Sequence, residues 1–216
     1  MIRKLWIFAI LLALLAAGCG THQVKVQPIK VEPVQLTLDV NVKVQQEQIE
    51  SAASALSPVI DQAAPDFTLL DHNQQPVKLS KLGGKWIVLY FYPKDDTPGC
   101  TIEARDFTRF LPQFQQMNAQ VLGISMDSPK SHCDFIEKHE LGVRLLSDPD
   151  HKVMELYGAW VSSSLGNLKY GRVIRTTMIV DPAGIIRHYW PEVIAQGHAE
   201  RVLLKVADLQ GRKLKS

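Results

Sequence analysis

The spacing of apolar residues changes along this chain, and the changes mark where strands and helices are expected. The run Trp86–Phe91 is short, continuously apolar and rich in β-branched and aromatic side chains, which is typical of a buried parallel strand. Apolar residues at helical spacing follow, and they predict the buried face of an amphipathic helix. They are Phe107, Phe110, Leu111, Phe114 and Met117. The chain therefore changes from strand to helix near residue 100.

Further strands and helices alternate after this point. Residues 121–125 predict a second buried strand, and Ser128 and Pro129 provide an N-cap and a first-turn proline for a helix that runs to about Leu141. Other expected elements are a hairpin at 67–79, a short helix after Pro149, an exposed insertion at 157–172, strands at 174–180 and 184–189, and a last helix at 198–209. This order predicts an α/β fold with a central mixed sheet and helices on both faces.

The first residues carry the features of an export signal. Arg3 and Lys4 precede thirteen apolar residues, which are too few to span a bilayer of about 30 Å as a helix. The stretch LAAGC at 15–19 resembles a bacterial lipoprotein signal, and the resemblance implies cleavage before Cys19 and lipidation of Cys19. A transmembrane anchor and an ordinary cleaved signal are the alternatives. We expect a lipoprotein of the cell envelope facing the periplasm, in the outer membrane rather than the inner one, because Gly20 stands where an Asp would favour inner-membrane retention.

Residues 34–44 alternate apolar and polar side chains and predict one amphipathic strand. A single strand does not fold alone, so it must pair with the domain's own sheet, with a second copy or with another protein. We interpret this segment as part of a tether, with an assembly module as the alternative. The expected organisation is a signal peptide at 1–18, a tether at 19–63, one domain at 64–209 and a polar tail at 210–216.

Composition and charge exclude some functions. The chain is 46% hydrophobic and 21% charged, as in globular proteins. Loss of residues 1–18 would remove Arg3 and Lys4 and leave 22 basic against 22 acidic residues, so nothing builds the basic field that nucleic acid requires. His132, Cys133 and His139 share one expected helix, but their spacing is not that of a metal site. We expect no metal and no other cofactor.

The candidate reactive residue is Cys100, which lies where the expected strand ends and the expected helix begins. Free backbone N–H groups and the positive end of the helix dipole favour a thiolate at such a position. Thr97 lies one turn earlier and is in reach of the sulfur with its hydroxyl, while Pro93 and Pro98 stiffen the loop. The sequence therefore predicts one activated, well-aimed thiol.

Four stretches together carry a resemblance to a known family. They are FYPKDDTPGCTIEA at 91–104, GISMDS at 123–128, LSD at 146–148 and RTTMIVD at 175–181. From about Ala64 to Leu209 the chain resembles the peroxiredoxins, in particular the bacterioferritin comigratory protein or Q type. The resemblance implies a thioredoxin-like fold in which Cys100 is the peroxidatic cysteine.

The resemblance also assigns the neighbours of Cys100. It implies that Pro93, Thr97 and Arg175 complete the active site and that Glu103 holds the arginine. A guanidinium offers a planar fork of donors, which suits holding a thiolate and a peroxide together. Without the surrounding pattern, Arg175 would be interpreted as a surface ion pair and Glu103 as a first-turn carboxylate stabilised by the helix dipole.

The implied function is a thiol-dependent peroxidase that reduces hydrogen peroxide and organic hydroperoxides through a sulfenic acid at Cys100. Its implied reductant is an external thiol or a thioredoxin-like protein. The alternative enzyme is a thiol–disulfide oxidoreductase, which is disfavoured because the residues 100–103 lack the second cysteine of a Cys-x-x-Cys pair.

Cys133 departs from the family pattern. Q-type members commonly carry a resolving cysteine five residues after the peroxidatic one, where this chain has Arg105, and others place it near Ile136. Cys133 lies three residues before Ile136, on the same helix face, and would resolve the sulfenic acid only after local unwinding. The alternative is a buried cysteine with no redox role, in an enzyme that uses one cysteine.

Overall fold

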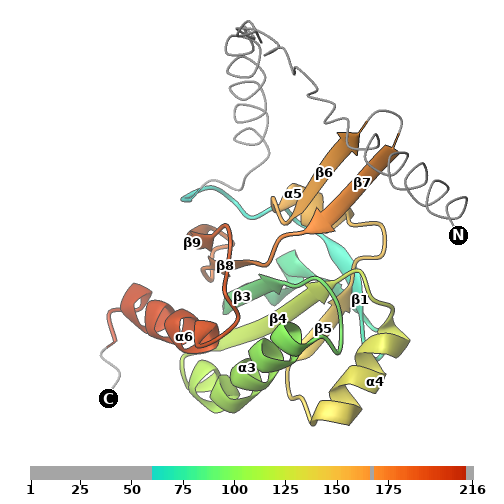
Figure 1. The fold of residues 1–216 in the computed structure, drawn as a ribbon. Coiled ribbons are helices and arrows are strands. Elements are labelled where there is room, and N and C mark those ends of the chain that lie inside the picture. Colours follow the sequence, from blue (N-terminus) through green and yellow to red (C-terminus); the bar gives the residue numbers. More distant parts are fainter. Residues whose placement is uncertain (1–59, 166–167, 213–216) are drawn as a thin grey trace, which may run out of the picture. The chain divides into compact units, whose positions relative to one another are not determined.

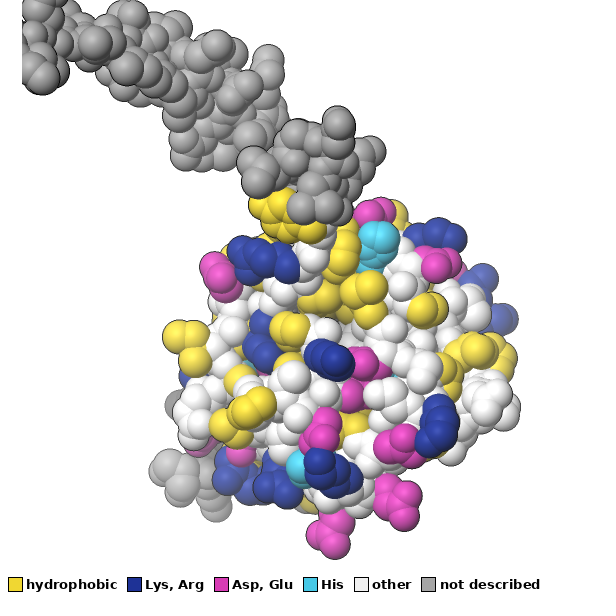
Figure 2. Space-filling model, turned by 45° about the vertical axis from the view of Figure 1, so that its right-hand side comes forward, with side chains coloured by type: hydrophobic (Ala, Val, Ile, Leu, Met, Phe, Trp, Pro, Cys, Tyr) yellow, Lys and Arg dark blue, Asp and Glu magenta, His cyan; other side chains and the backbone are white. Residues whose placement is uncertain are grey.

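The computed structural model describes residues 60–165 and 168–212. The expected signal peptide, Cys19 and the strand at 34–44 lie outside the described residues. Within the described ranges, no helix is long and apolar enough to cross a membrane. Basic and acidic side chains are interspersed over the face of the molecule shown in Figure 2.

A seven-stranded sheet forms the centre of the domain, in the order β2-β1-β5-β4-β3-β8-β9 (Figure 1). Strands β3, β4 and β5 run parallel, and the other pairings are antiparallel. The strands are β1 Thr68–Asp71, β2 Pro76–Lys78, β3 Trp86–Phe91, β4 Ala119–Ser125, β5 Arg144–Ser147, β8 Thr176–Val180 and β9 Ile186–Trp190. The predicted mixed sheet is thus confirmed.

Helices cover both faces of this sheet, which explains why β3 is apolar throughout. Val88, Tyr90 and Tyr92 belong to the core cluster that includes residues of α3, α4 and α6. Ile87, Leu89 and Phe91 alternate with them and belong to the opposite cluster, together with residues of α5 and the 3₁₀ helix η1. The helices are α3 Pro98–Gln116, α4 Pro129–His139, α5 Lys152–Leu156, α6 His198–Leu209 and η1 Leu79–Leu82. In Figure 1, α3 and α6 lie side by side.

An aromatic stack joins the sheet to α3 close to Cys100. The ring of Tyr90 lies 5.5 Å from that of Tyr92 and 4.7 Å from that of Phe107, and both pairs are stacked. The stack depends on Gly123 in β4, since a Cβ there would lie 2.5 Å from Cζ of Tyr90. Cys100 belongs to the same buried cluster, so the helix that carries it is packed firmly on the sheet.

Three local predictions need correction. Helix α4 ends at His139 because Glu140 adopts a left-handed conformation with φ 52°, before the expected stop at Gly142. Strand β8 begins at Thr176, two residues later than expected. The expected exposed insertion at 157–172 begins with the buried residues Tyr157 and Ala159 and continues as a two-stranded ribbon, β6 Trp160–Leu165 and β7 Leu168–Val173, that stands apart from the main sheet in Figure 1.

The described chain enters the domain along the edge strand β9. Ala63 forms an isolated antiparallel bridge with Ile185, and Asp61 and Gln62 exchange backbone hydrogen bonds of 2.8 and 2.9 Å with Ile186. The Arg187 side chain adds an ion pair of 2.7 Å to Asp61. Backbone and side-chain contacts therefore fix the start of the described domain to the sheet edge.

Candidate active site

Cys100 is the third residue of α3, directly after the loop that leaves β3. Its side chain is buried, with 2% of the residue exposed. Thr97 is the N-cap residue of α3, and its hydroxyl donates a 3.0 Å hydrogen bond to the carbonyl of Lys94. Within the described chain, the thiol and the Thr97 hydroxyl share no hydrogen bond. The Thr97 hydroxyl thus stabilises the loop backbone in this structure, while Pro93 is exposed at its start.

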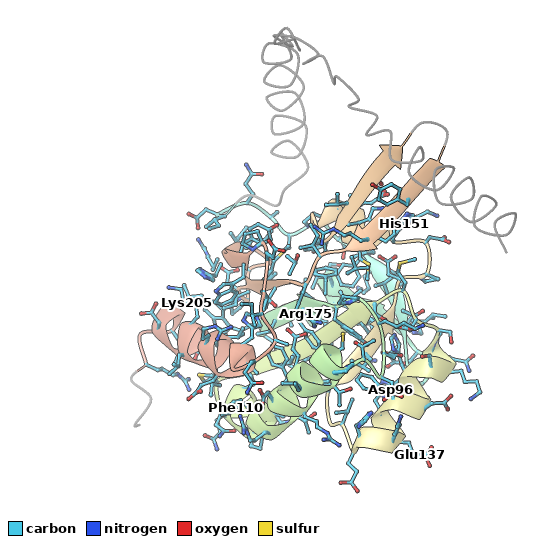
Figure 3. All side chains as sticks on the ribbon, in the orientation of Figure 1. Asp96, Phe110, Glu137, His151, Arg175 and Lys205 are labelled. Carbon is cyan, nitrogen blue, oxygen red and sulfur yellow. The ribbon has the colours of Figure 1, made fainter. Side chains whose placement is uncertain are left out.

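Arg175 reaches Cys100 from a segment 75 residues further along the chain. Its Nη2 donates a 3.1 Å hydrogen bond to Sγ of Cys100, and its Nη1 donates to Oε2 of Glu103. The backbone of Arg175 is fixed just before β8, where its carbonyl accepts from the N–H of Val193 at 3.0 Å. The structure thus brings together three of the predicted residues, Cys100, Glu103 and Arg175. Arg175 is labelled in Figure 3.

The guanidinium of Arg175 donates hydrogen bonds to two buried acidic groups, the Cys100 thiol and the Glu103 carboxyl. Burial raises the pKa of Glu103 to about 7, although the charge of Arg175 acts in the opposite direction. Burial opposes the charge of Arg175, but Glu103 and Cys100 outweigh it and raise the pKa of the guanidinium above its ordinary value. Oε1 of Glu103 and the hydroxyl of Tyr90 are buried without a hydrogen-bond partner among the described residues. Burial therefore decides the direction of the pKa shift of Glu103, whereas neighbouring acidic groups decide that of Arg175.

Two consecutive carboxylates hold the other side of the loop, and sequence reasoning missed both. Asp96 pairs with Lys138 and, at 2.6 Å, with Nε2 of His139, and it lies in the space between α3 and α4 (Figure 3). Arg105 donates to Nδ1 of the same imidazole at 3.2 Å. Asp95 is buried and contacts Ser131 and His132 of α4. Two acidic residues in a short turn are the only sequence signal for this side.

Cys133 lies in a different environment, on α4. It is exposed, and its Sγ donates a 2.9 Å hydrogen bond to the carbonyl of His72. The alternative of an inert, buried cysteine is therefore wrong as to burial, because this position of α4 is exposed. Cys100 and Cys133 are both free thiols in this structure. In the described part of the chain, no group of three or more His, Cys, Asp or Glu residues is placed to hold a metal ion.

Comparison with known proteins adds evidence that is independent of the site's geometry. The sequence pattern of the AhpC/TSA family matches residues 60–189. The peroxiredoxin Bcp of Bacillus subtilis is 39% identical over 150 residues, which is 69% of this chain and 96% of that protein.

Solved structures agree with the sequence relatives. The bacterioferritin comigratory protein of Xanthomonas campestris, whose structures were described for its alkyl peroxide reduction activity, matches with a TM-score of 0.63 at 33% identity, covering 66% of this chain and 91% of that one. A cysteine-to-serine mutant of PrxQ from Xylella fastidiosa matches with a TM-score of 0.65 at 34% identity, covering 71% and 98%.

Proposed function

Because this chain belongs to the AhpC/TSA family, among its Bcp and PrxQ peroxiredoxins, we propose that Cys100 carries its thiol peroxidase activity. One observation supports this assignment most directly. Cys100 lies at a helix N-terminus with its Sγ 3.1 Å from a guanidinium nitrogen of Arg175, and only 2% of the cysteine is exposed. A hydrogen bond from a guanidinium strengthens when the sulfur is an anion, and the anion is the form that attacks a peroxide.

The reaction balances with the groups at this site. The thiolate attacks one peroxide oxygen in line with the O–O bond, so that an S–O bond forms while the O–O bond breaks. Sulfur is oxidised by two electrons to the sulfenic acid, and the departing alkoxide or hydroxide takes a proton from solution to become an alcohol or water. Negative charge moves from sulfur to the departing oxygen during this step. The Arg175 guanidinium has five N–H groups, and those not used by Cys100 and Glu103 are suited to stabilising that charge.

An external thiol completes the cycle in this proposal. A first thiol attacks the Cys100 sulfenic acid, forming a disulfide bond and releasing water, and a second thiol then displaces the Cys100 thiolate. Cys133 is the internal alternative for the first attack. It is exposed within α4, and its thiol donates a hydrogen bond to the His72 carbonyl that it would have to give up before attacking.

The test is a single turnover. The protein is treated with one equivalent of hydroperoxide in the presence of dimedone, and the modified residue is identified by mass spectrometry. We expect the adduct on Cys100. An adduct that forms first on Cys133, with Cys100 unmodified, would contradict the assignment. Repeating the experiment without dimedone under non-reducing conditions reports whether a Cys100–Cys133 disulfide follows.

The proposed location is the cell envelope, with the enzyme anchored by a lipid on Cys19. This proposal is supported by the basic start, the short apolar run and the small residues before Cys19. Incorporation of labelled palmitate into the wild-type protein, and its loss in Cys19→Ala, is the expected result. Equal labelling of both proteins would exclude lipidation at this residue.

A further inference from the structure

A group of short hydrogen bonds outside the thiol site surrounds Asp95, in the loop between β3 and α3. Only 6% of this residue is exposed. Its Oδ1 accepts the hydroxyl of Tyr92 at 2.7 Å, and its Oδ2 accepts Oγ–H of Ser131 at 2.8 Å and Nδ1–H of His132 at 2.9 Å. Removing a carboxylate from water is costly unless its oxygens are paired, and here three donors converge on one side chain.

The donors to Asp95 come from separate elements. Tyr92 directly follows β3, whereas Ser131 and His132 lie in the first turns of α4, whose N-cap is Ser128. The backbone N–H of Asp95 adds a 2.8 Å hydrogen bond to Asp127, in the connection between β4 and α4. Backbone and side chain of one loop residue are therefore both fixed to α4 and the segment before it.

Burying a histidine at position 132 carries a cost in folding free energy. It is fully buried, and its Nε2 has no hydrogen-bond partner among the described residues. An unpaired buried polar atom costs about 1–3 kcal/mol, which an apolar side chain of similar size would avoid. The hydrogen bond between Nδ1 and Asp95 is the contact that such an apolar side chain could not make.

The loop that Asp95 fixes also carries the reactive thiol. Thr97 and Cys100 follow within five residues, and the Thr97 hydroxyl returns to the Lys94 carbonyl on the other side of Asp95. Arg175 is fixed independently, just before β8. The loop that contacts α4 through Asp95 thus leads directly into the turn of α3 that carries the sulfur.

We propose that Asp95 and His132 are positioning residues for peroxide reduction, and that their buried pair holds the loop against α4 so that Cys100 is aimed at Arg175. This inference rests on the proposed function. It assigns to α4 a part in the first chemical step that does not involve Cys133.

The experiment compares two reactions of the same sulfur in the full-length protein. Peroxide reduction needs an aligned pocket, whereas alkylation by iodoacetamide needs only a reactive, reachable thiol. Both rates at Cys100 are measured, the first by single-turnover stopped flow and the second by mass spectrometry of the Cys100 peptide. The variants are Asp95→Asn, His132→Leu, and His132→Asn, whose amide keeps a donor near the position of Nδ1. Asp134→Asn is the matched control, because Asp134 lies on α4 and pairs with Lys130 at the surface.

We expect the peroxide rate of Asp95→Asn and His132→Leu to fall by about tenfold to a hundredfold, since small misplacements at a reacting centre have effects of this size. Their alkylation rate should be unchanged or higher. His132→Asn should recover most of the peroxide rate, and Asp134→Asn should behave as wild type. If His132→Leu does not fold, Ser131→Ala removes one donor without opening a large cavity and should lose peroxide rate severalfold.

Two outcomes would overturn the inference. One is a peroxide rate that stays at the wild-type value in the folded variants, and the other is a parallel fall of both rates, which would indicate a general loss of the thiol site. Failure of the proposed function is a separate result, because it would appear as a wild-type protein whose Cys100 does not react with peroxide at all.

Discussion

The two thiols of the described domain differ in almost every physical respect. Cys100 is buried at the start of α3 and accepts a hydrogen bond from a cation. Cys133 is exposed on α4 and donates its proton to a neutral carbonyl. The first bond strengthens when sulfur loses its proton, and the second can exist only while the proton is present. We therefore expect the neighbours of each sulfur, and not its exposure, to set its reactivity toward peroxide.

Exchange of each cysteine for serine is the most severe test of this contrast. Cys100→Ser should lower single-turnover peroxide consumption by a factor of at least about a thousand, because loss of a nucleophile removes the covalent step. Cys133→Ser should consume its first equivalent of peroxide at the wild-type rate. Stopped-flow measurement with hydrogen peroxide checks both. Loss of the first turnover in Cys133→Ser would reverse the roles assigned to the two thiols.

Replacement of the guanidinium tests what makes the buried thiol special. Arg175→Lys keeps the charge but cannot bind Cys100 and Glu103 with a planar fork. We expect the second-order rate with peroxide to fall about a hundredfold, the usual effect of losing one aimed donor. Arg172→Lys, an exposed arginine on β7, is the matched control and should leave the rate unchanged. Equal rates in all three proteins would show that the hydrogen bond to sulfur has no role.

The buried carboxylate beside Cys100 should give the domain a pH-dependent stability. The pKa of Glu103 is raised to about 7 by burial, so the folded protein retains a proton that the unfolded chain loses near pH 4.5. The contribution of Glu103 to the free energy of unfolding is therefore fully present below pH 4.5 and is lost as the pH rises through about 7. Between pH 5 and pH 8 the wild type should therefore lose about 2–3 kcal/mol of unfolding free energy. Glu103→Gln has no carboxyl to titrate at this position and should not show this loss.

Urea unfolding at the two pH values measures this difference. Glu137→Gln provides the control, because the Glu137 side chain is exposed on α4 (Figure 3). Its difference from the wild type should not depend on pH. A Glu103→Gln difference that is constant, or that runs the other way, would show that Glu103 is ionised throughout this range.

The smallest expected effect concerns how readily a large reagent reaches each of the two thiols. A bulky maleimide should label Cys133 roughly ten times faster than Cys100, because a buried thiol reacts only after local opening. Peptide mapping of briefly labelled protein gives the ratio. Faster labelling of Cys100 would mean that its loop opens far more readily than its packing indicates.

The sequence predicts the elements well where burial follows a regular spacing. The strand at Trp86–Phe91 is confirmed residue for residue, and the last helix is α6 His198–Leu209 as expected. The ribbon at β6 and β7 was not predicted, because the serines at 162–164 interrupt any apolar alternation and the strands are joined by backbone hydrogen bonds. Local spacing encodes burial, but it carries little information on elements that are half exposed.

The residues of the site also differ in how far the sequence alone predicts them. The junction at Cys100 could be inferred from local pattern, whereas Arg175 was connected with it only through the family resemblance. The Asp95–His132 pair could not be predicted at all. The two residues are 37 positions apart, and the path of the loop across α4 decides whether they meet. Polar pairs of this kind depend on tertiary packing that no spacing rule describes.

The bridge between Ala63 and Ile185 also determines how a pull on the chain would reach the enzyme. Val180, which pairs with Ile186, faces Ile87 at the start of β3, while the opposite end of β8 lies beside Phe91, next to Arg175 and the loop to Cys100. A load applied ahead of residue 60 therefore enters at the end of the sheet remote from the sulfur and acts on an edge strand. The start of the described domain and the loop to Cys100 thus lie at opposite ends of strands β3 and β8.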